Sequence, residues 1–287
     1  MVTPVGADVG AAYASCERRA RSHYENFPVA SWLLPRPMRR HVAAVYAFAR
    51  VADDFADEGE LPRAERLRLL ERWKQRLLAA GKGESQPEPV QGEPDDSAAI
   101  FVALGETMRE RSLPVELLAD LLDAFRQDVD VSSYANWNEL LDYARRSANP
   151  VGRLVLRVAG YRDPRLDAWS DAVCTALQFT NFWQDIDTDA ARGRVYLPQT
   201  ERSLGPAIER TRELFAAGRP LCDAVRGRLR YELRATWLGG MRILDRVEAR
   251  SEVRRGLPSG RPAAGRPVLG LADVPSIAWH TLTWAAR

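Results

Sequence analysis

Most of this chain consists of segments in which apolar residues recur with the period of an α-helix, and prolines separate several of these segments. Proline stands at or near a first helical position at the breaks Leu61-Pro62, Leu113-Pro114, Asp163-Pro164 and Arg219-Pro220. No convincing run of alternating β-branched residues with hairpin turns is present. The sequence therefore predicts an all-α protein, with helices over residues 11–24, 36–57, 62–80, 97–111, 114–130, 137–159, 164–189, 203–217 and 219–250.

Two polar stretches rich in glycine and proline interrupt the helical pattern, at about residues 81–96 and 256–267. Both contain few apolar residues, so we expect mobile surface loops. Neither is typical of a domain boundary. Because the two acidic motifs described below lie on opposite sides of the first loop, helices from both sides would have to pack together to form one site. The simplest prediction is a single helical domain over residues 1–287.

Composition and charge exclude several classes of protein. The 41 basic and 39 acidic residues leave a formal charge of +2, which does not favour a nucleic-acid-binding protein. Cys16, Cys174 and Cys222 are odd in number and widely spaced, so we expect core residues in a reducing compartment. Residues 1–14 lack the pattern of a signal peptide, and the longest uncharged stretch, 172–184, is too short to span a bilayer. We predict a cytoplasmic protein, or one peripheral on the inner face of the membrane.

The C-terminal segment 274–284 contains Trp279 and Trp284 and is expected to form a short helix. Such a helix could lie at a membrane interface, or it could dock on the protein core. The sequence leaves both open, and docking is the favoured interpretation.

Two acidic motifs contradict the rules for a stable helix. Asp53 and Asp57, and likewise Asp185 and Asp189, are four residues apart, which places each pair on one helical face. Two such charges about 6 Å apart repel by roughly 3 kcal/mol at an effective dielectric constant of about 20. A cation should offset this repulsion, and Mg²⁺ shared with a diphosphate fits a set of carboxylate ligands best.

Each motif continues upstream as a polar ribbon on an otherwise apolar helix. Four- and three-residue steps lead from Asp53 to Arg50 and Tyr46, and from Asp185 to Asn181 and Gln178. A solvated helix face would carry more Lys, Glu and Ser than these surroundings do. We therefore expect both ribbons to line one interior cavity, where two or three Mg²⁺ ions would hold a diphosphate while its C–O bond breaks.

The remaining carbocation would need a dry pocket with aromatic faces. Aromatic side chains near the motifs could supply it, although each is more often a core residue: Phe27, Phe48, Phe55, Phe179, Phe182 and Trp183. The loop after the second motif, residues 192–198, carries Arg192 and Arg194 and could close over phosphate oxygens.

Rival interpretations predict other patterns. A di-iron bundle requires Glu-x-x-His pairs, which this chain lacks. A head-to-tail prenyltransferase would repeat the adjacent aspartate pair in its second motif, and Asp185-Ile186-Asp187 does not. A non-catalytic helical binding protein stays open and predicts no dependence on Mg²⁺.

From about residue 15 to about residue 250 the chain resembles the squalene/phytoene synthase family, the head-to-head prenyl synthases. The resemblance rests on elements in the family's order: Tyr46 and Arg50 before Asp53 and Asp57, Gln178 and Asn181 before Asp185 and Asp189, and Arg192, Arg194 and Tyr196 in the loop that ends at Pro198. It implies a helical bundle of the isoprenoid synthase type, with a central cavity lined by two aspartate-rich helices. It also implies Mg²⁺ at the four motif aspartates, with the other residues binding the diphosphate or substrate.

Within the family, the resemblance is closest to bacterial hydroxysqualene synthases of the hopanoid-type squalene route. The strings that carry it are residues 23–31, 146–153 and 181–185, in which Asn26, Asn149 and Gln184 stand where phytoene synthases and one-enzyme squalene synthases usually have other residues. The replacement of an arginine by Gln184 beside the metal site favours a subfamily that acts on an already joined intermediate.

The resemblance implies that presqualene diphosphate is ionised and that water quenches the cation, giving hydroxysqualene and diphosphate without NADPH. We expect Tyr46, Tyr134, Asn26 and Asn149 to be the catalytic residues, the last three orienting water or the departing group. The expected partner is the prenyl diphosphate substrate, with membrane contact or hand-off to neighbouring enzymes of the route as further expectations. Head-to-head condensation to squalene or phytoene is the alternative function.

Overall fold

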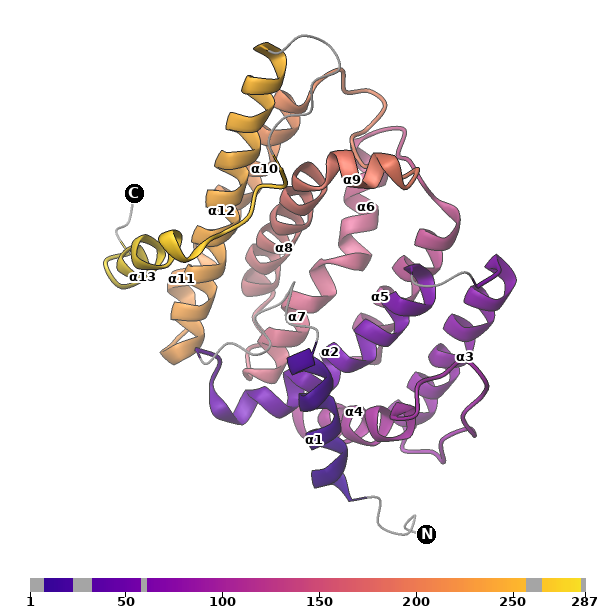
Figure 1. Ribbon diagram of the computed structural model, residues 1–287. Helices are drawn as coiled ribbons and strands as arrows, with labels where there is room; N and C mark the ends of the chain where they lie inside the picture. Colours follow the sequence, from indigo (N-terminus) through magenta and orange to yellow (C-terminus); the bar gives the residue numbers. More distant parts are fainter. Residues whose placement is uncertain (1–7, 23–32, 58–60, 257–264, 285–287) are drawn as a thin grey trace. The chain divides into compact units, whose positions relative to one another are not determined.

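The computed structural model describes residues 8–22, 33–57, 61–256 and 265–284, and helices account for most of them (Figure 1). Across these ranges, strand-like pairing is limited to one isolated parallel bridge between Ser133 and Val195. The predicted all-α class is therefore confirmed. The bounds predicted for α2 (Arg36–Asp57) and α4 (Ser97–Arg111) agree with the structure.

The helices belong to two compact units, each described here by itself. The first unit is formed by the described residues within 1–131 and 150–163. The second is formed by those within 132–149 and 164–287. The first contains α1 (Val9–Ser22), α2, α3 (Arg63–Lys82), α4, α5 (Val115–Asp130) and nearly all of α7 (Asn149–Val158). The second contains α6 (Trp137–Ser147), α8 (Pro164–Gln184), α9 (Ile186–Ala191), α10 (Leu204–Gly218), α11 (Leu221–Ala224), α12 (Gly227–Gly256), the 3₁₀ helix η2 (Leu271–Asp273) and α13 (Val274–Leu282). The prediction that both units form one single domain over residues 1–287 stays a prediction.

Helix α2 is the central element of the first unit, because it packs against α1, α3, α4 and α5. Small buried residues such as Ala44 and Ala47 let these neighbours approach closely, and Phe48 packs against the rings of Trp73 and Phe101. Phe55 also contacts the Trp73 ring and is a core residue. In the C-terminal half of α2 the polar side chains Tyr46, Arg50, Asp53 and Asp57 therefore share one face.

The first polar stretch forms a loop over residues 83–96 that is bound to α3 by arginines. Arg76 forms an ion pair with Glu93, and both side chains are only 1% exposed. Arg72 donates to the Glu88 carbonyl at 2.8 Å. These bonds fix the path of the loop along α3, and its mobility stays a prediction.

Helix α8 is the central element of the second unit and contacts α6, α9, α10, α11 and α12. Glycine allows two of the close approaches. A Cβ on Gly218 of α10 would lie 2.5 Å from Val173 Cγ2 on α8, and one on Gly240 of α12 would lie 2.7 Å from Leu177 Cδ2. The backbones of α10 and α12 thus pack closer to α8 than any larger residue permits at these points.

Three segments predicted as continuous helices are divided. Residues 137–159 break at Ala148, and α7 begins at Asn149 with Pro150 in its first turn, where the missing proline N–H is tolerated but could not continue the ladder of α6. Residues 219–250 break between α11 and α12, where Val225 is extended and Gly227 has a φ of 65°. The third break, at Asp185, belongs to the second acidic motif and is described with it.

The cysteines are free thiols, as expected of core residues. Cys16 and Cys222 are buried, and burial raises the pKa of each thiol to about 12. Both therefore stay protonated and act as small apolar side chains.

The C-terminal helix α13 packs against α12, in agreement with the favoured docking interpretation. Beyond its end, the Trp284 ring meets Trp237 of α12 edge to face, with 5.5 Å between the ring centroids. The second predicted loop, 256–267, lies mostly outside the described residues, which resume at residue 265.

Candidate active site

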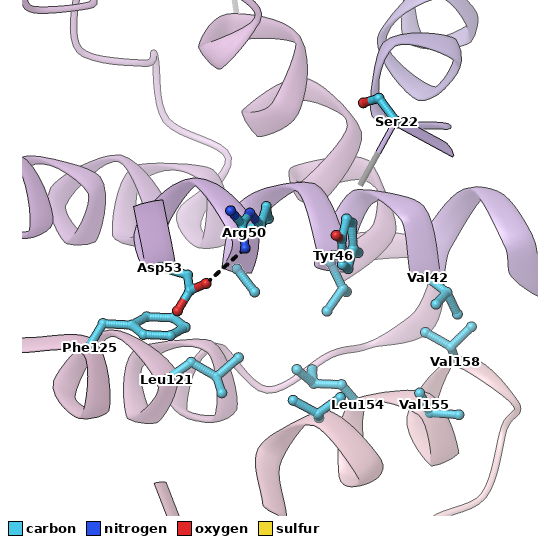
Figure 2. A pocket seen from close by; sticks show the side chains of 13 residues that line it. Ser22, Val42, Tyr46, Arg50, Asp53, Leu121, Phe125, Leu154, Val155 and Val158 are labelled. Carbon is cyan, nitrogen blue, oxygen red and sulfur yellow. Dashed lines mark hydrogen bonds and ion pairs between the residues drawn. The ribbon is translucent and has the colours of Figure 1, made fainter. Parts of the chain in front are cut away.

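The first acidic motif lies on the last two turns of α2, and its upstream polar residues share the same helical face. Figure 2 shows Tyr46, Arg50 and Asp53 in a row along α2, facing one cavity of the first unit. Asp57 is the last residue of α2 and is exposed. The predicted ribbon therefore exists, and three of its members meet at a cavity.

This cavity has a volume of about 480 Å³, and its walls are mostly apolar. Beside the polar row, its lining consists of Ser22, Val42, Val45, Ala49, Leu121, Phe125, Val151, Leu154, Val155 and Val158. Leu121 and Phe125 come from α5, the last four come from α7 and Ser22 ends α1, so four helices line an apolar space with polar groups along α2 (Figure 2). Such a space suits a hydrocarbon chain attached to an anionic group.

Sequence reasoning missed the walls contributed by α5 and α7. Their apolar residues repeat at helical spacing, as Leu121 and Phe125 do, and this signal is the same for a cavity wall as for a packed core. Only the helix packing separates the two cases.

Arg50 supplies the positive charge that the first motif was expected to need. Its guanidinium lies 3.2 Å from Asp53 Oδ2 and 2.7 Å from Asp54 Oδ1. The side chains of all three are partly exposed, at 24%, 39% and 25%. A salt bridge of this exposure is weak, so its carboxylates can exchange partners.

Tyr46 lies at the same cavity with a phenol that keeps its proton. Burial raises the pKa of Tyr46, and the carboxylates of Asp54 and Asp53 act in the same direction while Arg50 opposes them. The phenol is therefore a neutral O–H group at physiological pH.

The second motif lies where α8 ends and the short α9 begins. Asp185 separates the two helices, with φ −100° and ψ 9°, so the predicted continuous helix is divided here. The backbone N–H of Asp185 still donates to the Asn181 carbonyl at 2.9 Å, and that of Asp189 to the Asp185 carbonyl at 2.8 Å. The four-residue relation between the motif aspartates therefore survives the break.

Asp185 is paired with an arginine from far along the sequence. Arg266 Nε lies 2.5 Å from Asp185 Oδ1, and its Nη2 lies 2.8 Å from Oδ2. The adjacent Gln184 is 4% exposed, and its amide donates to the Pro267 carbonyl. Arg266 was not predicted as a site residue, because no local pattern links it to a motif 81 positions earlier.

The basic loop after the second motif is attached to the motif by its backbone. Arg194 N–H donates to the Asp189 carbonyl at 2.8 Å, and Gly193 has a φ of 79°, which favours glycine. The Tyr196 ring stacks on Phe182 with centroids 3.7 Å apart. Arg192 is exposed and Arg194 is half-buried, and the backbone N–H groups of both donate to the Asp189 carbonyl.

The other predicted residues have varied surroundings. Tyr134 is 2% exposed and stacks on Tyr196 at 6.0 Å. Asn149 Oδ1 accepts a hydrogen bond from Thr175 Oγ1 at 2.9 Å, which ties the start of α7 to α8. On α8, Gln178 is half-buried and Asn181 is exposed. Asn26 lies outside the described residues.

The structure thus brings Tyr46, Arg50 and Asp53 together in the first unit, while the second motif and its loop belong to the second unit. That the two motifs share one cavity stays a prediction.

Aspartate oxygens are the donors that suit Mg²⁺. Within the described ranges, no group of three or more His, Cys, Asp or Glu side chains is arranged to hold a metal. Magnesium at phosphate sites commonly uses one or two carboxylates together with substrate oxygens, so the aspartate pairs of these motifs fit such an ion.

Comparisons with known proteins agree with the predicted resemblance. A family model described as squalene/phytoene synthase matches residues 20–204. Hydroxysqualene synthase from Rhodopseudomonas palustris is 40% identical over 188 residues, which cover 65% of this chain and 59% of that protein. Hydroxysqualene synthase from Zymomonas mobilis is 39% identical over 206 residues, covering 70% of this chain and 64% of the relative. The chain thus spans about three fifths of the length of these relatives.

A solved structure supports the same assignment. Squalene synthase HpnC from Alicyclobacillus acidocaldarius superposes with a TM-score of 0.76 at 34% identity, covering 86% of this chain and 97% of that one. The predicted fold of the isoprenoid synthase type is therefore confirmed. The chain belongs to the squalene/phytoene synthase family of enzymes.

Proposed function

We propose that the protein converts presqualene diphosphate to hydroxysqualene, with release of diphosphate and capture of water by the carbocation. The observation that carries the proposal is the apolar cavity of about 480 Å³ with Tyr46, Arg50 and Asp53 in its wall. It offers an isoprenoid chain an apolar enclosure and offers the attached diphosphate a polar row. The names of the two relatives, at 40% and 39% identity, favour hydroxysqualene as the product.

In this proposal Asp53, Asp57, Asp185 and Asp189 hold two or three magnesium ions together with the diphosphate. When bound, magnesium supplies positive charge that stabilises the diphosphate as it leaves. Arg50, Arg192 and Arg194 add fixed positive charge, and guanidinium groups are well suited to phosphate oxygens. Gln178, Asn181 and Tyr196 complete the proposed substrate-binding set.

The cavity walls would control what reaches the cation. Val42, Leu121 and Leu154 would keep bulk water from a bound hydrocarbon chain, and the Phe125 ring lines the same cavity as Asp53, where its face could stabilise positive charge (Figure 2). The neutral O–H of Tyr46 can donate a hydrogen bond to the departing diphosphate. We propose Tyr134, Asn149 and Asn26 as the groups that orient water.

The proposal is tested by incubating the purified protein with Mg²⁺ and either presqualene diphosphate or farnesyl diphosphate, each with and without NADPH, and identifying the lipid product. We expect hydroxysqualene from presqualene diphosphate, with no requirement for NADPH and no turnover after magnesium is removed with EDTA. Squalene or phytoene formed from farnesyl diphosphate would instead establish head-to-head condensation.

We further propose that α13 brings the enzyme to the membrane surface, where a hydrocarbon substrate and the neighbouring enzymes of the route would be reached. Large apolar side chains are exposed on α13, including Trp279 at 64% and Leu282 at 70%, and Leu271 of the preceding η2 is 91% exposed. Residues 274–284 contain no acid, and the guanidinium groups of Arg219 and Arg234 lie 4.6 and 5.1 Å from the Trp284 ring. An apolar face beside arginines suits an anionic bilayer surface. No described helix has the length and apolar character needed to cross a membrane.

Sedimentation with phosphatidylglycerol vesicles tests this contact. Replacing both Trp279 and Leu282 by glutamate should lower the bound fraction at least about tenfold, since two buried apolar side chains contribute about 3 kcal/mol or more. Leu78→Glu is the matched control, because Leu78 of α3 is also an exposed leucine, at 42%. Equal binding by the double variant and the wild type would exclude α13 as the contact.

A further inference from the structure

Asp185 is bound by an arginine that a chelating metal ion would have to displace. The guanidinium of Arg266 contacts both carboxylate oxygens, at 2.5 and 2.8 Å, so both are occupied by one bidentate partner. The side chains are 46% and 24% exposed. This pair is therefore within reach of ions from solution.

The segment that carries Arg266 is itself fastened to α8 and α12. We call residues 266–273 the C-terminal strap. Its carbonyl at Pro267 accepts from Gln184, its carbonyl at Val268 accepts from Arg246, and Arg246 Nη2 also lies 2.7 Å from Asp273 Oδ1. These contacts fix the backbone that follows Arg266, so the fold holds Arg266 beside Asp185.

The other acidic motif shows the same arrangement by a different route. There Arg50, one turn upstream on the same helix, neutralises Asp53 at 3.2 Å. In the second motif the equivalent polar position carries Asn181, which is uncharged, and the charge comes from the strap instead. An arginine therefore contacts the first aspartate of each motif, but Arg50 also pairs with Asp54 at 2.7 Å, whereas Arg266 binds both oxygens of Asp185.

We propose that Arg266 is the resident counter-ion of Asp185 and competes with divalent cations for its carboxylate oxygens. This inference rests on the proposed function, in which Asp185 binds magnesium. Arg266 already occupies one lone pair on each Asp185 oxygen, so a metal ion that approaches both oxygens from the same side can chelate them only when Arg266 leaves. The strap sets the affinity of the metal-free enzyme for the ion and keeps the displaced arginine beside the motif.

The test is a titration of the full-length protein with Mn²⁺, without substrate, followed by the electron paramagnetic resonance of free Mn²⁺. Removing the competitor in Arg266→Gln should tighten Mn²⁺ binding about three- to tenfold, the range expected for a partly exposed bidentate pair. Arg266→Lys, which keeps the charge but loses the two-point contact, should give an intermediate affinity.

Arg250→Gln is the matched control. Arg250 of α12 pairs at 2.8 Å with Asp187 of α9, two residues after Asp185, so this variant removes an equal charge without freeing Asp185. Its Mn²⁺ affinity should stay within about twofold of the wild type. Equal shifts in the two glutamine variants, or no shift in either, would overturn the competition.

Asp185→Asn separates failure of the competition from failure of the metal site. It should weaken Mn²⁺ binding, and adding Arg266→Gln to it should then change nothing. If Asp185→Asn leaves the Mn²⁺ affinity unaltered, Asp185 is not a metal ligand, and the proposed competition with Arg266 is also wrong. If Asp185→Asn weakens binding while Arg266→Gln has no effect, only the competition is wrong. Circular dichroism confirms that each variant is folded.

Discussion

Asparagine at Asp57 or at Asp189 is expected to lower kcat/KM at least about a hundredfold, as expected when a group that stabilises developing charge is lost. Each variant removes one proposed magnesium ligand and keeps the size of the side chain. For Asp57→Asn the free energy of unfolding should change by less than about 0.5 kcal/mol, because Asp57 is an exposed surface residue. Asp57 also ends α2, where a negative charge opposes the helix dipole, so its neutralisation has no destabilising effect there.

Asp187→Asn is the matched control for Asp189→Asn. Both residues lie on α9, but Asp187 is paired with Arg250 and lies four residues from neither motif aspartate. Its activity should stay within about threefold of the wild type, because the exposed Asp187 carboxylate is paired with Arg250 and is not one of the proposed metal ligands. Steady-state rates of diphosphate release and urea unfolding curves make the comparison. Activity retained in Asp57→Asn or Asp189→Asn would remove that aspartate from the metal site.

Arg76→Met is expected to lower the free energy of unfolding by about 3–5 kcal/mol, the range found when one partner of a buried ion pair is removed. Arg76 and Glu93 are each 1% exposed, and the guanidinium also lies 4.5 Å from the Phe101 ring. Without the arginine, the Glu93 carboxylate stays buried with no opposite charge. Urea unfolding at pH 7 measures the loss.

A second substitution identifies the cause of this loss. In Arg76→Met with Glu93→Leu, no charge is left buried, and most of the stability should return, because apolar replacement of a whole buried pair is often neutral. Equal destabilisation in the single and double variants would show that packing around Arg76, rather than charge, determines the effect.

Apolar periodicity and proline positions predicted correctly those helices whose ends are marked by residues close in sequence. The helix over 36–57 was predicted to the residue, since its apolar period is strong and α2 is buried on most sides. The breaks before Pro150 and at Gly227 were missed, because the apolar period continues across them. At these two points proline and glycine interrupt the helix, although the apolar periodicity alone favours one long helix.

The polar row of the first motif was predicted because all its members lie on one helix. Tyr46, Arg50 and Asp53 follow from the steps of four and three residues alone. Three other features were not predicted: the cavity wall from α5 and α7, the Arg266–Asp185 pair and the Arg76–Glu93 pair. Each of them joins residues that are distant in sequence. Tertiary packing decides these contacts, and a single sequence carries no periodic signal for them.

Turnover of presqualene diphosphate in ¹⁸O-labelled water, with Mg²⁺ and without NADPH, tests the central claim most directly. Capture of a carbocation by water predicts hydroxysqualene whose hydroxyl oxygen is ¹⁸O, with one diphosphate released for each product molecule. An unlabelled hydroxyl, or squalene that forms only when NADPH is supplied, would contradict it.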